Sequence, residues 1–569
     1  MTQNTHDRSN ISPFIAQDQM FLADVIEHLD QVEDLSPTRK RDLKSAIRSI
    51  ARLVHGSLET TPANINWLNV RLRRVHPAEA NISKKRFQNI KSDALKALEL
   101  VGASRSRKDW LSAPSDAWQA LLDDIPDKHD RWKLTQLAQY CSAIGCAPSH
   151  VTDQVLIDLL KVIMEESFQN RPEHVVANAI KAWNGLRREI DGWPDIALSP
   201  LPPKKPRWTF PLDTFPESFQ ADVASWLDRL SNPDLLDGSG PAKPLRPSTV
   251  AHRRFQIQEA ASALVRSGRP QGEVTSLALL VDLKNLKAAL RWMIDLFDGK
   301  PTEAIKGVAI CLQAIAKHHV KLPDDDIAQV KGIITRMGRE DGGLREKNRL
   351  RLLQLEDPGN LAKLLHLPTA LVTEAERLFT IRPRKAALLL QAALGIEILL
   401  NAPMRISNLA TLHLTDHMRP HRVGRERRTH IHIPPQEVKN NVALDYELGD
   451  EATSLLDIYL RKARPILLDQ PSDYLFPARN GGPKPSAHLS RLIKETILEH
   501  TGLTIHAHLF RSIAGKIHSL AQPGDFVTLA YVLNDSLKTA MKSYAQFERR
   551  SALEHYQASV AAARKRKAP

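Results

Sequence analysis

The sequence predicts a mainly α-helical protein that ends in an α+β domain with a small antiparallel sheet. Apolar residues spaced three to four apart, the pattern of amphipathic helices, dominate the first two thirds of the chain. Alternation of apolar and polar residues, typical of strands, follows at 428–435, "RTHIHIPP", and at 441–450, "NVALDYELGD". Helical patterns run to about 418 before these two strands and resume at Glu451 after them.

The clearest of the predicted helices covers 35–54, "LSPTRKRDLKSAIRSIARLV". Ser36 or Thr38 can cap its start beside Pro37. Apolar residues then recur along one face that we expect to be buried: Leu43, Ile47, Ile50 and Leu53. The opposite face carries arginine and lysine.

Similar helical openings recur along the chain, so the first two thirds is predicted to contain three divergent copies of one helical unit. The openings are at 35–54, 125–141 and 245–265, and the closing helices at 82–102, 171–190 and 301–320. Convergent helix patterning explains the similarity equally well. The irregular spacing of the copies argues against a solenoid with a fixed repeat.

Proline-rich breaks at 199–216, 231–247 and a hinge at 337–354 separate the predicted domains. The expected domains are helical units at 1–110, 111–205 and 206–345, and an α+β domain with a C-terminal tail at 346–569. A chain of 569 residues is too long for one ordinary core, so several domains are expected.

The composition indicates a soluble protein with a polyanionic partner. Lysine and arginine number 79 against 65 acidic residues, a net charge of +14, which favours nucleic acid or an anionic membrane surface. No apolar run is long enough for a membrane span, and the N-terminal sequence has no signal-peptide pattern. The three cysteines form no CxxC motif, so neither a disulfide framework nor a cysteine zinc site is expected. We therefore expect a cytoplasmic, nucleoid-associated protein.

Arg405 stands in the apolar stretch "LGIEILLNAPMRISNLATLHL", at a break between two predicted helices. An unpaired buried guanidinium is costly, so it must meet an anion from the protein or from a ligand. Lys439 lies in the predicted turn between the two strands. His508 and Arg511 share "HAHLFRSIAGKIH", and Tyr544 closes the helical stretch "LAYVLNDSLKTAMKSY".

The order and spacing of these segments resemble the tyrosine recombinase (phage integrase) family over roughly residues 350–560. "PMRISNLATL" resembles its first arginine box, "HLFRS" its His-x-x-Arg box, and "VLNDSLKTAMKSY" the segment that ends on its nucleophilic tyrosine. The resemblance implies a catalytic domain at 346–569 and a core-binding, SAM-like DNA-binding domain at 206–345.

The resemblance also implies a role for each site residue. Arg405 and Arg511 would neutralise the phosphate, because the guanidinium fork matches phosphate oxygens and stays charged. Tyr544 would attack phosphorus and form a 3′-phosphotyrosyl link. Lys439 would protonate the leaving 5′-oxygen, and His508 would act as general base or orient the phosphate. No metal, nucleotide or organic cofactor is required.

The sequence departs from the family pattern where a second histidine or a tryptophan is usual. That position falls on Asn534 or Asp535, depending on the residue from which the spacing is counted. An asparagine amide can donate a hydrogen bond to phosphate. An ionised Asp535 would repel it, so slower chemistry is expected. Ser512 follows Arg511, where a histidine is common.

Other residues compete for the assigned roles. Arg405 can instead pair with an acid such as Asp416, and His506 is a rival of His508. Tyr531 is expected in the core, and Tyr556 lies beyond the usual spacing. His430 and His432 alternate on a predicted strand, but no acid or cysteine pattern around them indicates a metal site. The basic runs 419–428 and 564–567 are expected to contact DNA phosphates.

The sequence therefore predicts a site-specific DNA recombinase that cuts and rejoins double-stranded DNA. The length of the N-terminal part suggests the recombinase of a mobile genetic element rather than a minimal housekeeping resolvase. The family implies a tetramer on synapsed sites, with the tail after Tyr544 docking on a neighbour. Partner recombinases are a further candidate interaction. The alternatives are a catalytically weak DNA-binding accessory protein, a type IB topoisomerase-like enzyme and a helical scaffold.

Overall fold

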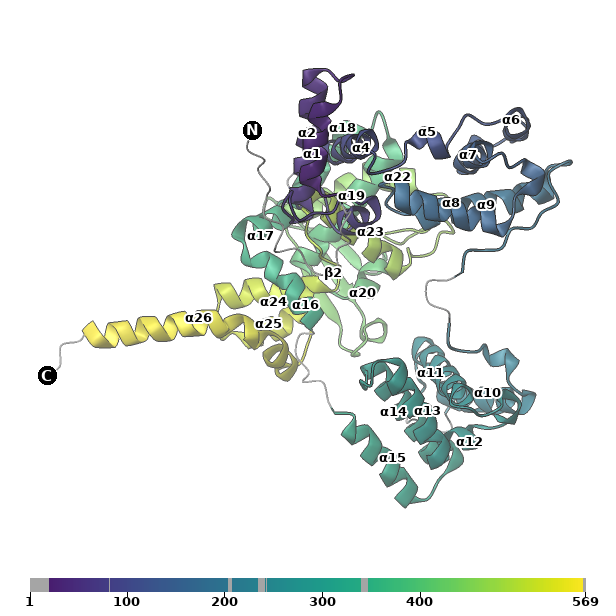
Figure 1. Ribbon diagram of the computed structural model, residues 1–569. Helices are drawn as coiled ribbons and strands as arrows, with labels where there is room; N and C mark the ends of the chain where they lie inside the picture. Colours follow the sequence, from purple (N-terminus) through teal and green to yellow (C-terminus); the bar gives the residue numbers. More distant parts are fainter. Residues whose placement is uncertain are drawn as a thin grey trace. The chain divides into compact units, whose positions relative to one another are not determined.

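The computed structural model describes residues 20–80, 82–202, 207–233, 241, 243–338 and 346–565. The N-terminal stretch 1–17 and parts of the three predicted linkers and of the basic run 564–567 lie outside these residues. The described residues of Met1–Leu201 and Leu344–Pro569 form one compact unit, and those of Pro202–Gly343 form a second (Figure 1). No described helix combines the length and the apolar character that a membrane crossing requires.

The N-terminal part of the first unit is helical and has two hydrophobic cores. The helices of the first core are α1 (Leu22–Gln31), α2 (Pro37–Leu53), α3 (Ile65–Leu72) and α4 (Lys84–Leu100). The helices of the second core are α5 (Arg107–Trp110), α6 (Asp116–Asp123), α7 (Lys128–Ala143), α8 (Asp153–Glu166) and α9 (Pro172–Glu189).

Helix α2 begins as the sequence predicts. The Ser36 side chain accepts a hydrogen bond from the backbone N–H of Arg39 (3.3 Å), and Pro37 occupies the first helical turn. Leu43, Ile47 and Ile50 are buried on one face. The buried spacing of three to four residues explains why the amphipathic pattern identified this helix correctly.

The second unit is built around its own core. Its helices are α10 (Glu217–Ser231), α11 (Pro247–Arg266), α12 (Leu277–Val281), α13 (Leu283–Leu296), α14 (Glu303–Ile315) and α15 (Asp324–Arg336). The predicted helices at 245–265 and 301–320 correspond to α11 and α14, and a π-helical turn continues α14 over Ala316–Val320. The bounds of the four predicted domains stay predictions.

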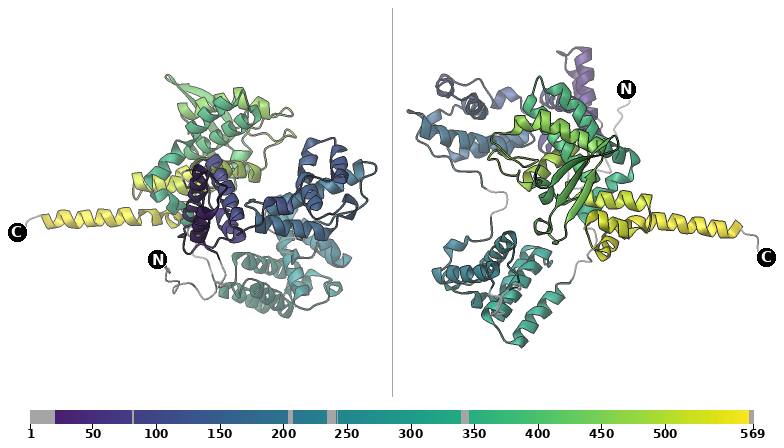
Figure 2. Two further views of the ribbon diagram at one scale, coloured as in Figure 1. Left: turned by 45° about the horizontal axis from the view of Figure 1, so that its top comes forward. Right: turned by 180° about the vertical axis from the view of Figure 1, so that it is seen from behind.

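The C-terminal domain combines helices with one small sheet, as predicted. The helices before the sheet are α16 (Glu346–Leu353), α17 (Pro358–Leu365), α18 (Leu367–Leu378), α19 (Pro383–Asn401) and α20 (Ile406–Ala410). The helices after it are α21 (Asp450–Ile458), α22 (Arg464–Leu467), α23 (Ser486–Thr501), α24 (Leu509–Ala521), α25 (Phe526–Leu533) and α26 (Leu537–Lys565). The right view of Figure 2 shows the sheet from behind, and α19 and α21 pack against its strands.

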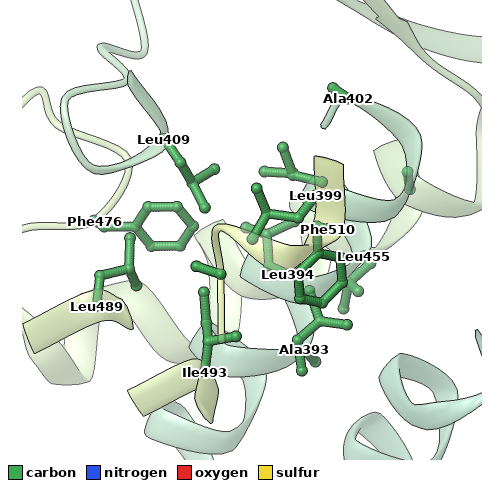
Figure 3. Close-up of a cluster of buried hydrophobic side chains, with 14 of the residues drawn as sticks. Ala393, Leu394, Leu399, Ala402, Leu409, Leu455, Phe476, Leu489, Ile493 and Phe510 are labelled. Carbon is green, nitrogen blue, oxygen red and sulfur yellow. The ribbon is translucent and has the colours of Figure 1, made fainter. Parts of the chain in front are cut away.

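Helix α19 is the centre of this domain. It packs against α18, α21, α22, α23 and α24, which explains why its sequence is apolar on nearly every side. In Figure 3, Phe510 of α24 and Leu455 of α21 lie beside Ala393, Leu394 and Leu399 of α19. The core therefore fixes the end of α19, which leads into the loop that carries Arg405, and the start of α24, which carries Arg511.

The sheet has three antiparallel strands in the order β1 (Met418–Val423), β2 (Glu426–Ile433) and β3 (Leu444–Leu448). The two predicted strands correspond to β2 and β3. The expectation that helices continue to 418 was wrong, because α20 ends at Ala410 and β1 was missed. Strand β1 lies at the sheet edge and only Met418 in it is buried, so it carries no alternating pattern.

The segment after Tyr544 was also predicted incorrectly as a short helix and tail. Helix α26 runs without interruption from Leu537 to Lys565 (Figure 1). The helix contains no glycine or proline and is rich in alanine, with lysine and arginine as further helix-favouring residues. Tyr544 therefore lies within a long helix rather than at its end.

Candidate active site

Arg405 lies in the short loop between α19 and α20 and immediately precedes α20. Its backbone is extended, and its carbonyl accepts the first hydrogen bonds of α20, from Asn408 (2.9 Å) and Leu409 (3.1 Å). The Arg405 side chain is 24% exposed. Burial lowers the pKa of this guanidinium and the charge of Arg511 lowers it further, while the carboxylate of Asp535 raises it. Arg405 is therefore a partly buried cation with a second cation nearby.

Arg511 is almost fully buried in the first turns of α24. Its Nη1 donates to the carbonyl oxygen of Pro403 (3.1 Å), in the same loop as Arg405. Its Nη2 donates to Oδ2 of Asp535 (2.7 Å). These two bonds hold the Arg511 fork against the loop that carries Arg405, so the two predicted arginines converge.

Asp535 is the anion that both arginines face. It lies in the short connection between α25 and α26, and its Oδ1 is 3.8 Å from Nη2 of Arg405. The neighbouring Asn534 faces elsewhere: its Nδ2 donates to the carbonyl oxygens of Val442 (3.1 Å) and Ala443 (3.2 Å). Of the two residues considered for the second-histidine position, the structure places Asp535 beside the arginines. The suggested pairing of Arg405 with Asp416 does not occur, because the acid paired with Arg405 is Asp535.

Tyr544 is buried on α26, where its ring packs against Gly515 of α24. The ring also stacks on Phe547, with centroids 6.2 Å apart and planes 26° apart. Burial raises the pKa of the Tyr544 hydroxyl, whereas the charges of Arg511 and Arg405 lower it. Gly515 lies one helical turn after Arg511 in α24, so this packing brings Tyr544 close to Arg511 and its partner Asp535.

Lys439 and His508 border this group. Lys439 is exposed in the connection between β2 and β3, as its position in the sequence predicts, and His508 immediately precedes α24. His508 keeps an exposed face, yet loss of water around its ring lowers its pKa, and so do the charges of Arg511, Arg405 and Lys439. The lowered pKa favours the neutral imidazole, the form that can accept a proton.

Sequence reasoning missed Tyr446 of β3. Its hydroxyl donates to the carbonyl oxygen of Val532 (3.0 Å), and burial raises its pKa to about 12 even though Arg511 and Arg405 act against this. The alternation of β3 gave the signal, because Leu444, Tyr446 and Leu448 share the inward face. Tyr446 ties the strand to the end of α25 beside the candidate site.

The two competing tyrosines are exposed and lie apart from this buried group, whereas the competing His506 is half-buried. The expectation that Tyr531 is a core residue was wrong: it is 80% exposed, because α25 buries Leu529, Ala530 and Leu533 instead. Tyr556 is 66% exposed on α26. Burial lowers the pKa of His506 to about 4.

Two alternating histidines on β2 also lie apart from the group. His430 and His432 both contact Asp445 across the sheet. Among the residues that the structure describes, no three histidine, cysteine or acidic side chains come together as a metal site.

Comparison with known proteins identifies the domain that carries this group. Residues 371–546 match the model of the phage integrase family, and all the predicted site residues fall within them. The C-terminal domain is a phage integrase domain. No curated protein matches the sequence.

Solved recombinase structures resemble the protein at low sequence identity. XerH site-specific recombinase bound to difH substrate has 18% identity and a TM-score of 0.35, over 57% of this chain and 80% of that one. A lambda integrase(75-356) dimer bound to a COC' core site has 16% identity and a TM-score of 0.33, over 57% of this chain and 94% of that one. XerA recombinase has 14% identity and a TM-score of 0.24, over 58% and 98%.

Proposed function

We propose that this protein is a site-specific DNA recombinase that cuts and rejoins DNA strands through a 3′-phosphotyrosyl intermediate on Tyr544. The observation that carries the proposal is the convergence of Arg405 and Arg511 on one carboxylate, beside a buried tyrosine of α26. Two guanidinium groups directed at one anion form a site for a phosphodiester. The membership of residues 371–546 in the phage integrase family supports the same chemistry.

The first step is attack of the Tyr544 hydroxyl on phosphorus. The new bond joins the phenolic oxygen to phosphorus, the bond from phosphorus to the 5′-oxygen breaks, and a free 5′-hydroxyl leaves. Arg405 and Arg511 stabilise the charge that gathers on the non-bridging oxygens. Rejoining reverses the step, with a 5′-hydroxyl attacking the phosphotyrosine, so the bond energy is kept and no cofactor or metal is needed.

Proton transfer falls to the two residues at the border of the site. The lowered pKa of His508 favours its neutral form, which can take the phenolic proton or orient the phosphate. Lys439 is exposed in the connection between β2 and β3 and is the proposed acid for the leaving 5′-oxygen. Its exposure leaves it free to approach DNA.

The rest of the chain has proposed roles in holding DNA. We assign DNA contacts to the helical units and to the basic runs, because a net charge of +14 favours a polyanion. The proposed active form is a tetramer on two synapsed sites at the nucleoid, with α26 as the element that reaches a neighbouring subunit. The proposed biological setting is a mobile genetic element, in which partner recombinases are candidate interactors.

Covalent trapping in cells tests the proposal. Tagged protein is purified under denaturing conditions, and any DNA that remains attached is sequenced. Tyr544→Phe is the test variant, and Tyr556→Phe, which removes an exposed tyrosine of the same helix, is the matched control. We expect attached DNA with wild type and Tyr556→Phe, and none with Tyr544→Phe. The proposal fails if no protein carries DNA, or if Tyr544→Phe carries as much as wild type.

Two alternatives make different predictions in the same experiment. A DNA-binding accessory protein, which the carboxylate of Asp535 favours, would bind DNA at low salt without covalent attachment. A type IB topoisomerase-like enzyme would attach to many unrelated sequences and relax supercoils. A helical scaffold would require Arg405, Arg511 and Tyr544 to lie apart, and the carboxylate shared by the two arginines argues against it.

A further inference from the structure

The two arginines of the candidate site already hold an anion that belongs to the protein. One oxygen of Asp535 accepts a hydrogen bond from Arg511 Nη2 (2.7 Å), and the other lies 3.8 Å from Arg405 Nη2. Each carboxylate oxygen therefore faces a different guanidinium. A phosphodiester would present its two non-bridging oxygens to these arginines in the same way.

The charges of the site make this contact costly for the proposed reaction. Arg405 and Arg511 together carry two positive charges, and Asp535 cancels one of them. Attack on phosphorus raises the negative charge on the non-bridging oxygens, and catalysis depends on donors already directed at that charge. With Asp535 in place, the phosphate would meet a carboxylate as well as the arginines.

We propose that Asp535 occupies the phosphate site of the DNA-free protein and must leave it before Tyr544 can attack. The inference rests on the proposed function, because it assigns the same two arginines to the scissile phosphate. It makes Asp535 a residue that controls access to the site. Asp535 thus competes with the substrate phosphate, in addition to replacing a histidine that would assist the reaction.

The position of Asp535 in the chain gives it a way to leave. It belongs to the short connection between α25 and α26, in which Asn534 adopts a left-handed backbone (φ 48°, ψ 49°). Helix α26 starts two residues later and carries Tyr544, whose side chain is only 5% exposed. A shift of the start of α26 would withdraw the carboxylate and change the exposure of the tyrosine together.

The same connection is linked to the loop that carries Lys439. Asn534 donates to the carbonyl oxygens of Val442 and Ala443, and its own carbonyl accepts a hydrogen bond from Asn440 Nδ2 (3.1 Å). A DNA backbone that draws Lys439 toward it would pull on these bonds. DNA contact at the β2–β3 connection can therefore promote the release of Asp535.

The test measures binding of inorganic phosphate to the full chain by calorimetry at low ionic strength. Asp535→Asn keeps the shape of the side chain and removes its charge. Asp473→Asn, an exposed acid of the same domain, is the control for the change in net charge. We expect Asp535→Asn to bind phosphate at least tenfold more tightly than wild type or Asp473→Asn. The gain should disappear in the double variant Asp535→Asn/Arg405→Gln.

Other results would overturn the inference. Equal affinity in Asp535→Asn and Asp473→Asn would mean that the carboxylate does not compete with phosphate. Weaker binding in Asp535→Asn would mean that Asp535 only holds the arginines in place. Asp535→Ser is a second uncharged variant, and loss of cooperative unfolding in both would assign Asp535 to the fold of the site.

The phosphate assay is independent of covalent DNA attachment. Tighter phosphate binding without any covalent DNA would uphold the competition between Asp535 and phosphate for the two arginines, and would reject the recombinase proposal. Covalent DNA together with unchanged phosphate binding would support the recombinase proposal and reject the competition between Asp535 and phosphate.

Discussion

The absence of a side chain at Gly515 leaves room for the ring of Tyr544, the proposed nucleophile. Replacing Gly515 with alanine should therefore displace Tyr544 and slow the reaction. A Cβ at Gly515 would lie 2.6 Å from Cδ1 of Tyr544 and 3.0 Å from both Cγ and Cε1. Ordinary van der Waals contacts are 3.4–4 Å. Because Cγ is bonded directly to Cβ of Tyr544, rotation of the ring alone cannot relieve the clash. The tyrosine or α26 must retreat by about 1 Å, a misplacement that costs on the order of 100-fold in rate.

The effect on stability should be smaller than the effect on the reaction. Overpacking a buried contact costs about 1–3 kcal/mol, and replacing a glycine inside a helix by alanine returns about 0.5–1 kcal/mol. The net loss expected for Gly515→Ala is therefore about 0–2.5 kcal/mol. Stability is measured by urea unfolding, and the reaction by the fraction of protein with covalently attached DNA.

Gly185→Ala on α9 is the matched control, because a Cβ there meets nothing within 4 Å. We expect it to gain about 0.5–1 kcal/mol of stability and to keep the wild-type fraction of attached DNA. Equal attachment in Gly515→Ala and Gly185→Ala would refute the argument that packing on Gly515 sets the position of Tyr544.

Two further substitutions probe the charges of the domain. Arg511→Lys should lower covalent attachment about 100-fold and destabilise the protein by about 1–3 kcal/mol, because lysine keeps the charge but lacks the planar fork that bonds the Pro403 carbonyl and the Asp535 carboxylate at once. Attachment equal to wild type in the trapping assay would contradict this. The pKa of His506 is about 4 in the folded protein and 6.5 in the unfolded chain. As the pH falls, the unfolded chain therefore takes up this proton before the folded protein does. Stability should therefore fall between pH 6.5 and about 4, and His506→Asn should flatten that fall in urea unfolding, whereas an unchanged slope would contradict the assignment.

The helical part of the fold could be predicted because it follows from local patterns. The buried face of α2 and its Ser36 cap depend on residues close together in the sequence. The alternation of β2 and of β3 is likewise a local pattern within each strand. Strand β1 could not be found, because it is an exposed edge strand whose pairing with β2 depends on residues elsewhere in the chain. Tyr531 was misjudged because only the fold decides which side of a short helix faces the core.

The candidate site was predictable as a set of residues and not as an arrangement. The resemblance singled out Arg405, Arg511 and Tyr544, and the fold brings them together. The resemblance pointed to Asp535 only as a departure from the family pattern. Its contact with both arginines depends on the connection between α25 and α26, and the packing of Gly515 on Tyr544 depends on two helices that meet only in the folded chain.

The central claim is that Tyr544 becomes covalently bound to DNA, and the mass of one peptide tests it most directly. Protein recovered with DNA under denaturing conditions is digested with nuclease and then trypsin, which releases residues 543–549, "SYAQFER", with Tyr544 as the single tyrosine. The account predicts this peptide with a phosphate-linked nucleotide on Tyr544. An unmodified 543–549 peptide, with the nucleotide found instead on the peptide 551–564 that contains Tyr556, or on no peptide at all, would contradict it.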